Sequence, residues 1–121
     1  MRVLVCGGRD FFDADLLYSG LRQLSEGDTI TEIAHGGAKG ADSLAGRYAT
    51  AHNIPCIVFP ADWGKHGKSA GPIRNTDMLH RFDPDVVLAC PGGKGTKHMV
   101  DLAVKEGYKV FNLDYQQEEE V

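Results

Sequence analysis

Short apolar runs alternate along the chain with longer stretches in which apolar residues recur every three or four positions. The short runs predict strands, and the longer stretches predict helices. The first long stretch is residues 13–25, in which Leu17, Leu21 and Leu24 lie on one helical face. We expect strands at residues 3–6, 29–35, 55–59, 85–90 and 108–113, helices at residues 13–25, 41–52, 72–81 and 96–106, and a polar loop at residues 60–70.

This strict alternation of strand and helix predicts a parallel sheet, because each parallel connection needs a crossover segment. Residues 3–5, 57–59 and 86–89 are apolar at successive positions, which is typical of strands covered on both faces. The expected fold is therefore α/β: a single Rossmann-like doubly wound domain of five mainly parallel strands with helices on both faces. The domain is expected to span residues 1–115, and residues 116–121 are predicted to form an acidic, disordered tail.

Composition narrows the function classes. The chain has 121 residues, of which 42% are hydrophobic and 25% charged, so one domain can bury a core. No apolar run approaches the roughly 20 residues of a membrane helix, and three cysteines without CxxC spacing predict no metal site. We expect a cytoplasmic protein with reduced thiols and no cofactor. The net charge of −4 disfavours duplex nucleic acid as a partner.

The chain has 15 glycines, and pairs of them follow three of the predicted strands. In a doubly wound sheet these turns lie at the carboxyl edge, where ligands bind. Glycine allows close approach of backbone N–H groups, and the following helix points its N-terminus at the same place. The three turns are Gly7-Gly8-Arg9-Asp10, Gly36-Gly37-Ala38-Lys39 and Pro91-Gly92-Gly93-Lys94-Gly95-Thr96.

Such turns predict a site for an anion, most often a phosphate group. The sequence has neither a Walker A loop nor a GxGxxG fingerprint, so ATPase and ordinary NAD-dehydrogenase functions are disfavoured. Lysines and arginines gather in or beside the turns, which favours a compact anionic ligand. These residues are Arg9, Lys39, Lys65, Lys68, Arg74, Lys94 and Lys97.

Arg74 is expected to clamp the anion. Pro72 suits the first position of a helix, with Gly71 at the cap, which would place Arg74 in the first turn. A cation there opposes the helix dipole unless an anion lies between them. Lys65 and Lys97, taken singly, are expected to be solvated.

With the neighbouring segments, these turns resemble the YspA-type, YpsA-related branch of the SLOG superfamily, in order and over nearly the whole chain to about Leu113. SLOG also includes the "lonely guy" phosphoribohydrolases and the DNA-processing Smf proteins. The resemblance implies a Rossmann-like domain that senses or processes nucleotides or nucleotide-derived ligands. It also implies a homodimer, by analogy with the enzyme relatives. The matching segments are residues 7–11, 35–42, 59–63, 70–75 and 91–96.

One position departs from the phosphoribohydrolase pattern. Those relatives carry Pro-Gly-Gly-x-Gly-Thr-x-x-Glu, and Met99 stands where the catalytic glutamate would be. Cleavage of an N-glycosidic bond needs a nearby carboxylate. Asp10, Asp42 and Asp62 are the candidates to replace it. Asp42 also suits a helix start, Asp62 a turn cap, and Asp10 a turn cap or an ion pair with Arg9.

Three candidate functions therefore remain. The first is a nucleotide-binding module, with the phosphate on the turn at residues 91–96. The second is hydrolysis of the N-glycosidic bond of a nucleoside monophosphate. Single-stranded nucleic-acid binding is the third and least favoured. The expected ligand-binding residues are Gly7, Gly8, Arg9, Asp10, Gly36, Gly37, Ala38, Lys39, Asp42, Trp63, Arg74, Asn75, Pro91, Gly92, Gly93, Lys94, Gly95 and Thr96.

Trp63 and Thr96 each have two interpretations. Trp63 is the single tryptophan and lies in a polar segment, so it either stacks on a base or packs that segment onto the domain. Thr96 is expected to cap the last helix, with a hydroxyl that also reaches the phosphate.

Overall fold

The computed structural model describes residues 1–114, and its centre is one parallel sheet. The strands are β1 (Arg2–Cys6), β2 (Glu32–His35), β3 (Cys56–Val58), β4 (Val86–Ala89) and β5 (Val110–Asn112). Their order across the sheet is β3-β2-β1-β4-β5, and every neighbouring pair is parallel. The chain therefore winds outward from β1 in both directions, and the switch point between β1 and β4 is where such sheets bind ligands.

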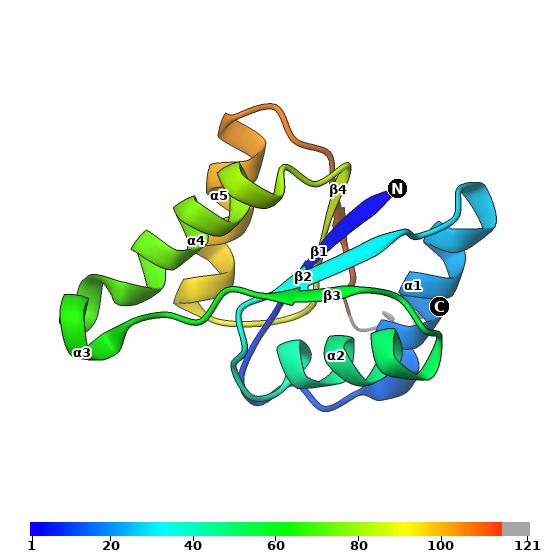
Figure 1. Cartoon of the computed structure of the whole chain (residues 1–121), viewed down its shortest axis with the longest axis horizontal. Helices are drawn as coiled ribbons and strands as arrows, with labels where there is room; N and C mark the ends of the chain where they lie inside the picture. The colour runs from blue at the N-terminus through cyan, green and yellow to red at the C-terminus, as the bar shows by residue number, and fades with distance from the viewer. Residues whose placement is uncertain (115–121) are drawn as a thin grey trace, which may run out of the picture.

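Helices cover both faces of this sheet, which confirms the predicted doubly wound α/β fold. They are α1 (Ala14–Gly27), α2 (Ala41–Ala51), α3 (Trp63–His66), α4 (Ala70–Phe82) and α5 (Lys94–Lys105), with a short 3-10 helix η1 (Gly67–Ser69). Figure 1 shows α4 and α5 on one side of the sheet and α1 and α2 on the other. The predicted acidic tail lies outside the described residues.

Alternate residues of β1 pack into opposite layers. Val3 and Val5 belong to the cluster formed with α1 and α2, whereas Leu4 and Cys6 belong to the cluster formed with α4 and α5. Val3, Leu4 and Val5 are fully buried, and each such side chain contributes about 1.5–3 kcal/mol to folding. This two-sided burial explains why residues 3–6 of the strand are apolar at every position.

The prediction of coverage on both faces is wrong for Ile57 and Val58, whereas Phe59 is half-buried against the core. β3 is one of the two edge strands, and Ile57 and Val58 are 38% and 48% exposed. An edge strand borders a neighbour on one side only, so an apolar sequence there does not ensure burial.

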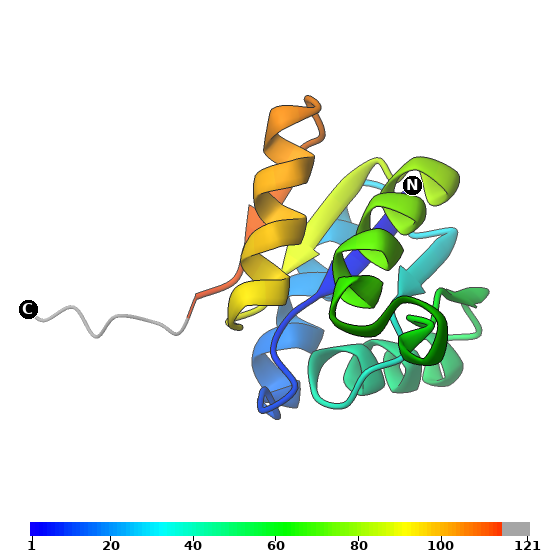
Figure 2. The same ribbon diagram turned by 90° about the vertical axis from the view of Figure 1, so that its left-hand side faces the viewer.

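The predicted loop at residues 60–70 is also wrong, because this segment contains α3, η1 and the first residue of α4. The carboxylate of Asp62 starts α3 by accepting a hydrogen bond from the Lys65 N–H at 3.0 Å. Helix α4 begins two residues before Pro72, which is tolerated there because the first-turn N–H groups have no intrahelical partner. Figure 2 shows α3 at the N-terminal end of α4.

The last helix begins earlier than expected. Its N-cap is Gly93, so Thr96 lies in the first turn of α5 and is not the capping residue. The start of α5 was not predicted at Lys94 because the Gly-Lys-Gly sequence there has a low helix propensity. The helix ends before Gly107, which has a φ of +84° and stops it as predicted.

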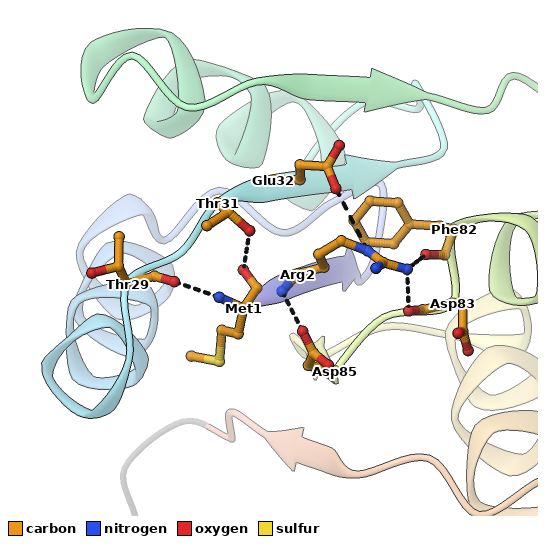
Figure 3. Close-up of polar contacts among 8 residues, drawn as sticks. All are labelled: Met1, Arg2, Thr29, Thr31, Glu32, Phe82, Asp83 and Asp85. Carbon is orange, nitrogen blue, oxygen red and sulfur yellow. Dashed lines mark hydrogen bonds and ion pairs between the residues drawn. The ribbon is translucent and has the colours of Figure 1, made fainter.

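Arg2 ties together the amino edge of the sheet (Figure 3). Its backbone N–H donates to Asp85 Oδ2 at 2.7 Å, and its guanidinium donates to the carbonyls of Phe82 and Asp83. The same guanidinium lies 3.5 Å from the Glu32 carboxylate. These contacts join β1 to β2 and to the segment before β4, at the end of the sheet opposite the glycine-rich turns.

No helix within residues 1–114 is both long and apolar enough to cross a lipid bilayer.

Gly40 allows the turns after β1 and β2 to meet. Its φ is +74°, and a Cβ there would collide with the Gly8 carbonyl oxygen and lie 2.6 Å from that of Arg9. We expect Gly40→Ala to lower the free energy of unfolding by about 2–3 kcal/mol, through backbone strain and the collision.

Urea unfolding of Gly40→Ala measures this effect. The matched control is Gly27→Ala at the end of α1, where an added Cβ meets nothing within 4 Å. That control should change stability by less than about 1 kcal/mol. Equal stability of the two variants would contradict the close approach of the turns.

Candidate functional site

A cavity of about 790 Å³ opens at the carboxyl edge of the sheet. The turns after β1, β2 and β4 line it together with parts of α3, η1, α4 and α5. All the expected ligand-binding residues line this cavity except Gly37 and Lys39. The structure therefore brings segments from distant parts of the chain to one concave surface.

The backbone of Gly8 joins the three glycine-rich turns. Its N–H donates to the Pro91 carbonyl at 2.9 Å, and its own carbonyl accepts from the Ala41 N–H at 3.2 Å. A Cβ on Gly8 would lie 3.0 Å from the Gly92 Cα, and a Cβ on Gly92 would lie 2.7 Å from the Gly8 nitrogen, which explains the glycine at both positions. These contacts fix the turns after β2 and β4 relative to the turn after β1.

In the turn after β2, the N–H groups of Gly36, Gly37 and Ala38 are already bonded to side chains of the protein. The Asp42 carboxylate accepts from the N–H groups of Gly36 and Ala38, both at 3.1 Å. The Gly37 N–H donates to His35 Nδ1 at 3.0 Å. The chain's own carboxylate therefore takes the place that we expected for an external anion. Asp42 caps this turn from inside α2, whose N-cap is Gly40.

Arg74 is bonded to the protein as well. Its Nη1 donates to the carbonyls of Gly36 and Phe59 at 2.7 and 3.3 Å, and its Nε donates to Asn75 Oδ1 at 3.0 Å. Because α4 begins at Ala70, Arg74 lies in its second turn, so the expected first-turn position is wrong. Arg74 lines the cavity and also holds the turn after β2 in place.

The buried side chains of Asp42 and His35 form a cluster with the half-buried Arg74 guanidinium beneath that turn. Burial raises the pKa of Asp42, and the Ala38 N–H and the neighbouring cations oppose the rise. Burial lowers the pKa of His35, whereas the Asp42 carboxylate pulls it upward. The Arg74 guanidinium is also desolvated, which lowers its pKa, and Asp42 again compensates. Removing one member would leave the others uncompensated.

The turn after β4 differs, because its amides are open. The N–H groups of residues 92–96 have no acceptor within the described chain, and the first intrahelical bond of α5 comes from Lys97 to Gly93 O at 3.0 Å. Helix α5 has no side-chain cap and no acidic residue in its first turn. Successive free amides at a helix N-terminus form a binding place for an anion.

Cationic and aromatic side chains flank this turn. Arg9, Lys68 and Lys94 line the cavity. The Arg9 guanidinium lies 5.8 Å from the centre of the Trp63 ring, which is 49% exposed. Lys97 instead bonds Asp101 at 2.8 Å on the surface of α5. The cavity therefore offers positive charge and an accessible aromatic face.

The three candidate carboxylates differ in their contacts and in whether they line the cavity. Asp42 is occupied as described, and Asp62 caps α3 and does not line the cavity. Met99 is 1% exposed and belongs to the core cluster beneath α4 and α5. Asp10 lines the cavity, and its side chain has no partner among the described residues. It is the carboxylate best placed to meet a ligand.

The structure adds cavity residues that our expectation omitted. They are Val5, Cys6, Phe11, Lys68, Gly71, Pro72, Met78 and His98. His98 could have been found from the sequence, because it lies one helical turn beyond Lys94 once the start of α5 is placed correctly.

Burial raises the pKa of Cys6 above its usual range and that of Cys90 to about 12, so both thiols stay protonated. Within residues 1–114, no three His, Cys, Asp or Glu side chains gather as metal ligands.

Comparison with known proteins places these features in a family. The model of the YspA, cpYpsA-related SLOG family matches residues 1–66. The chain belongs to this SLOG family. The Gene 61 protein of Mycobacterium phage D29 is 38% identical over 120 residues, which cover 93% of this chain and 95% of that protein.

A solved structure supports the fold. DNA processing protein A (DprA) from Streptococcus pneumoniae superposes with a TM-score of 0.51 at 17% identity. The match covers 91% of this chain but only 58% of that chain. At this identity the likeness concerns the Rossmann-like architecture of the SLOG domain.

Removal of the Asp42 carboxylate tests the role of the buried cluster. Asp42→Ala leaves two backbone N–H groups and the Arg74 guanidinium without their acceptor or counter-charge. We expect it to lower the free energy of unfolding by about 3–5 kcal/mol, measured by chemical denaturation. Asp10→Ala, on the exposed turn, is the control and should change stability by less than about 0.5 kcal/mol. Two equally stable variants would show that the cluster does not hold the turn.

Proposed function

We propose that this SLOG domain binds a nucleotide or a nucleotide-derived small molecule, with a phosphate group on the amides of residues 92–96. The observation that carries the proposal is the contrast between two turns. One is already filled by Asp42, and the other presents free N–H groups at the start of α5. A phosphate supplies the acceptor oxygens that these amides lack.

The rest of the cavity suits the other parts of a nucleotide. Its volume of about 790 Å³ lies within the range of small-molecule sites. Trp63 offers an exposed ring on which a base can stack, and Asp10 offers a carboxylate to ribose hydroxyls. Arg9 and Lys68 supply positive charge at the side of the cavity formed with α3 and η1. Such a ligand agrees with the cytoplasmic location expected from the sequence.

Binding without turnover is the form of the proposal that we favour. The position of the phosphoribohydrolase glutamate is held by Met99, whose side chain is buried in the core. A carboxylate is needed next to the anomeric carbon to stabilise an oxocarbenium-like transition state. The site is therefore suited to recognition, as in a sensor of nucleotide-derived signals. A homodimer, proposed by analogy with enzyme relatives, is compatible with this role.

Hydrolysis of the N-glycosidic bond of a nucleoside monophosphate is the second candidate. One observation favours it: the Asp10 carboxylate lines the cavity without a side-chain partner in residues 1–114. Chromatography for released base, with the wild-type chain and a panel of nucleoside monophosphates, tests it. Turnover that Asp10→Asn abolishes would establish the hydrolase and overturn recognition alone.

Single-stranded nucleic acid remains the least supported ligand. The printed name of the Streptococcus pneumoniae neighbour refers to DNA processing, but that likeness is one of fold. A net charge of −4 opposes binding to a polyanion. A salt-dependent affinity for oligonucleotides that exceeds the affinity for mononucleotides would reverse this ranking.

Gly93→Val tests the proposed phosphate position. A Cβ on Gly93 meets nothing within 4 Å, so the variant should fold normally. Its branched side chain would stand over the open amides and prevent close approach of the phosphate. We expect the affinity for a nucleoside monophosphate, measured by calorimetry, to fall at least about tenfold.

Gly27→Val is the matched control, because Gly27 also has open space around it and lies on α1. It should bind the nucleotide like the wild-type chain. Full affinity in Gly93→Val would remove the 92–96 turn from the site.

A further inference from the structure

The side chain of Asn75 links α4 to the start of α5 with every polar atom in use. Its Oδ1 accepts from Arg74 Nε at 3.0 Å. Its Nδ2 lies 3.2 Å from the Gly95 carbonyl oxygen and 3.1 Å from His98 Nδ1. Asn75 is only 6% exposed, so water does not compete for these bonds.

These partners fix which end of the Asn75 amide is nitrogen. The Arg74 Nε–H can only donate, so it must face the amide oxygen. The Gly95 carbonyl can only accept, so it must face the amide nitrogen. Rotating the amide by 180° would place its nitrogen against the Arg74 Nε–H donor and its oxygen against the Gly95 carbonyl acceptor. Each of these contacts would be repulsive, so that orientation is excluded.

The fixed amide determines the tautomer of His98. Because Asn75 Nδ2 donates, His98 Nδ1 must be the acceptor and carries no proton. In a neutral imidazole the proton then resides on Nε2. Within residues 1–114, Nε2 has no hydrogen-bond partner, so it is a free donor.

His98 is placed to use this donor at the candidate site. Its side chain lines the cavity, and it lies on α5 one turn beyond Lys94. Side chains on a helix tilt toward its N-terminus, so the imidazole leans toward the turn that carries the open amides. The ring is half-buried, which limits its mobility.

We propose that His98 is a ligand-contacting residue whose Nε2–H donates to a phosphate oxygen of the nucleotide at the 92–96 turn. Asn75 is the positioning residue that keeps the proton on that nitrogen, and Arg74 in turn orients Asn75. This inference rests on the proposed function for its ligand, but the tautomer belongs to the free protein. It assigns His98 a role in recognising phosphate that its sequence position did not indicate.

The first measurement is the ¹⁵N spectrum of the imidazole groups in the full-length chain without ligand. We expect His98 to show the neutral tautomer with the proton on Nε2. In Asn75→Asp, a carboxylate oxygen replaces the donating nitrogen, and the proton should move to Nδ1. A wild-type His98 already protonated on Nδ1 would overturn the inference whatever the ligand.

The second measurement compares affinities for AMP and for adenosine by calorimetry. His98→Asn, which keeps the acceptor near Asn75 but lacks a group at the Nε2 position, should bind AMP about 10- to 100-fold more weakly. His98→Gln, whose amide N–H reaches that position, should recover most of the affinity. Adenosine affinity should be the same in all three proteins, because adenosine has no phosphate.

The outcomes separate the two proposals. If the wild-type chain binds AMP and His98→Asn binds it equally well, the role of His98 is overturned while the proposed function stands. If no nucleoside monophosphate binds the wild-type chain, the proposed function fails, and the phosphate contact of His98 fails with it. An equal loss of adenosine and AMP affinity in His98→Asn would point to a structural effect and contradict the phosphate contact.

Discussion

The two hydrogen bonds that Asp42 accepts from Gly36 and Ala38 organise the carboxyl edge of the sheet. They fill one glycine-rich turn with a carboxylate of the chain itself, and Arg74 compensates the buried charge. Since the Gly8 backbone joins this turn to the one after β4, the rigid cluster also sets the position of the open amides. Two turns that both carry a Gly-Gly pair followed by Lys-Gly therefore differ in role: one supports the structure, and the other is a candidate binding surface.

Much of the fold could be predicted from the sequence, because parallel strands buried on both faces are apolar at successive positions, as residues 3–6 of β1 and all of β4 are. The convergence of the glycine-rich turns followed from the same topology. The partner of Asp42 could not be predicted, since a carboxylate two residues into a helix bonds either its own helix or a neighbouring turn. The exposure of Ile57 and Val58 depends on strand order, which local sequence does not encode.

The residues that line the cavity are the basis for preferring recognition to catalysis in the proposed function. The turn at residues 92–96 presents open amides, and because Met99 lies in the core, Asp10 is the carboxylate that lines the cavity without a side-chain partner in residues 1–114. The same packing of α4 against α5 that buries Met99 also places Asn75 between Arg74 and His98. The contact between these helices therefore forms part of the cavity wall and also determines which polar groups face the cavity.

A crystal structure of the chain with a nucleoside monophosphate would test the central claim most directly. We expect the phosphate oxygens to lie within hydrogen-bond distance of the N–H groups of residues 92–96, with Asp42 still bonded to Gly36 and Ala38. A phosphate seated on the turn after β2 in place of Asp42, or density only outside the cavity, would contradict it.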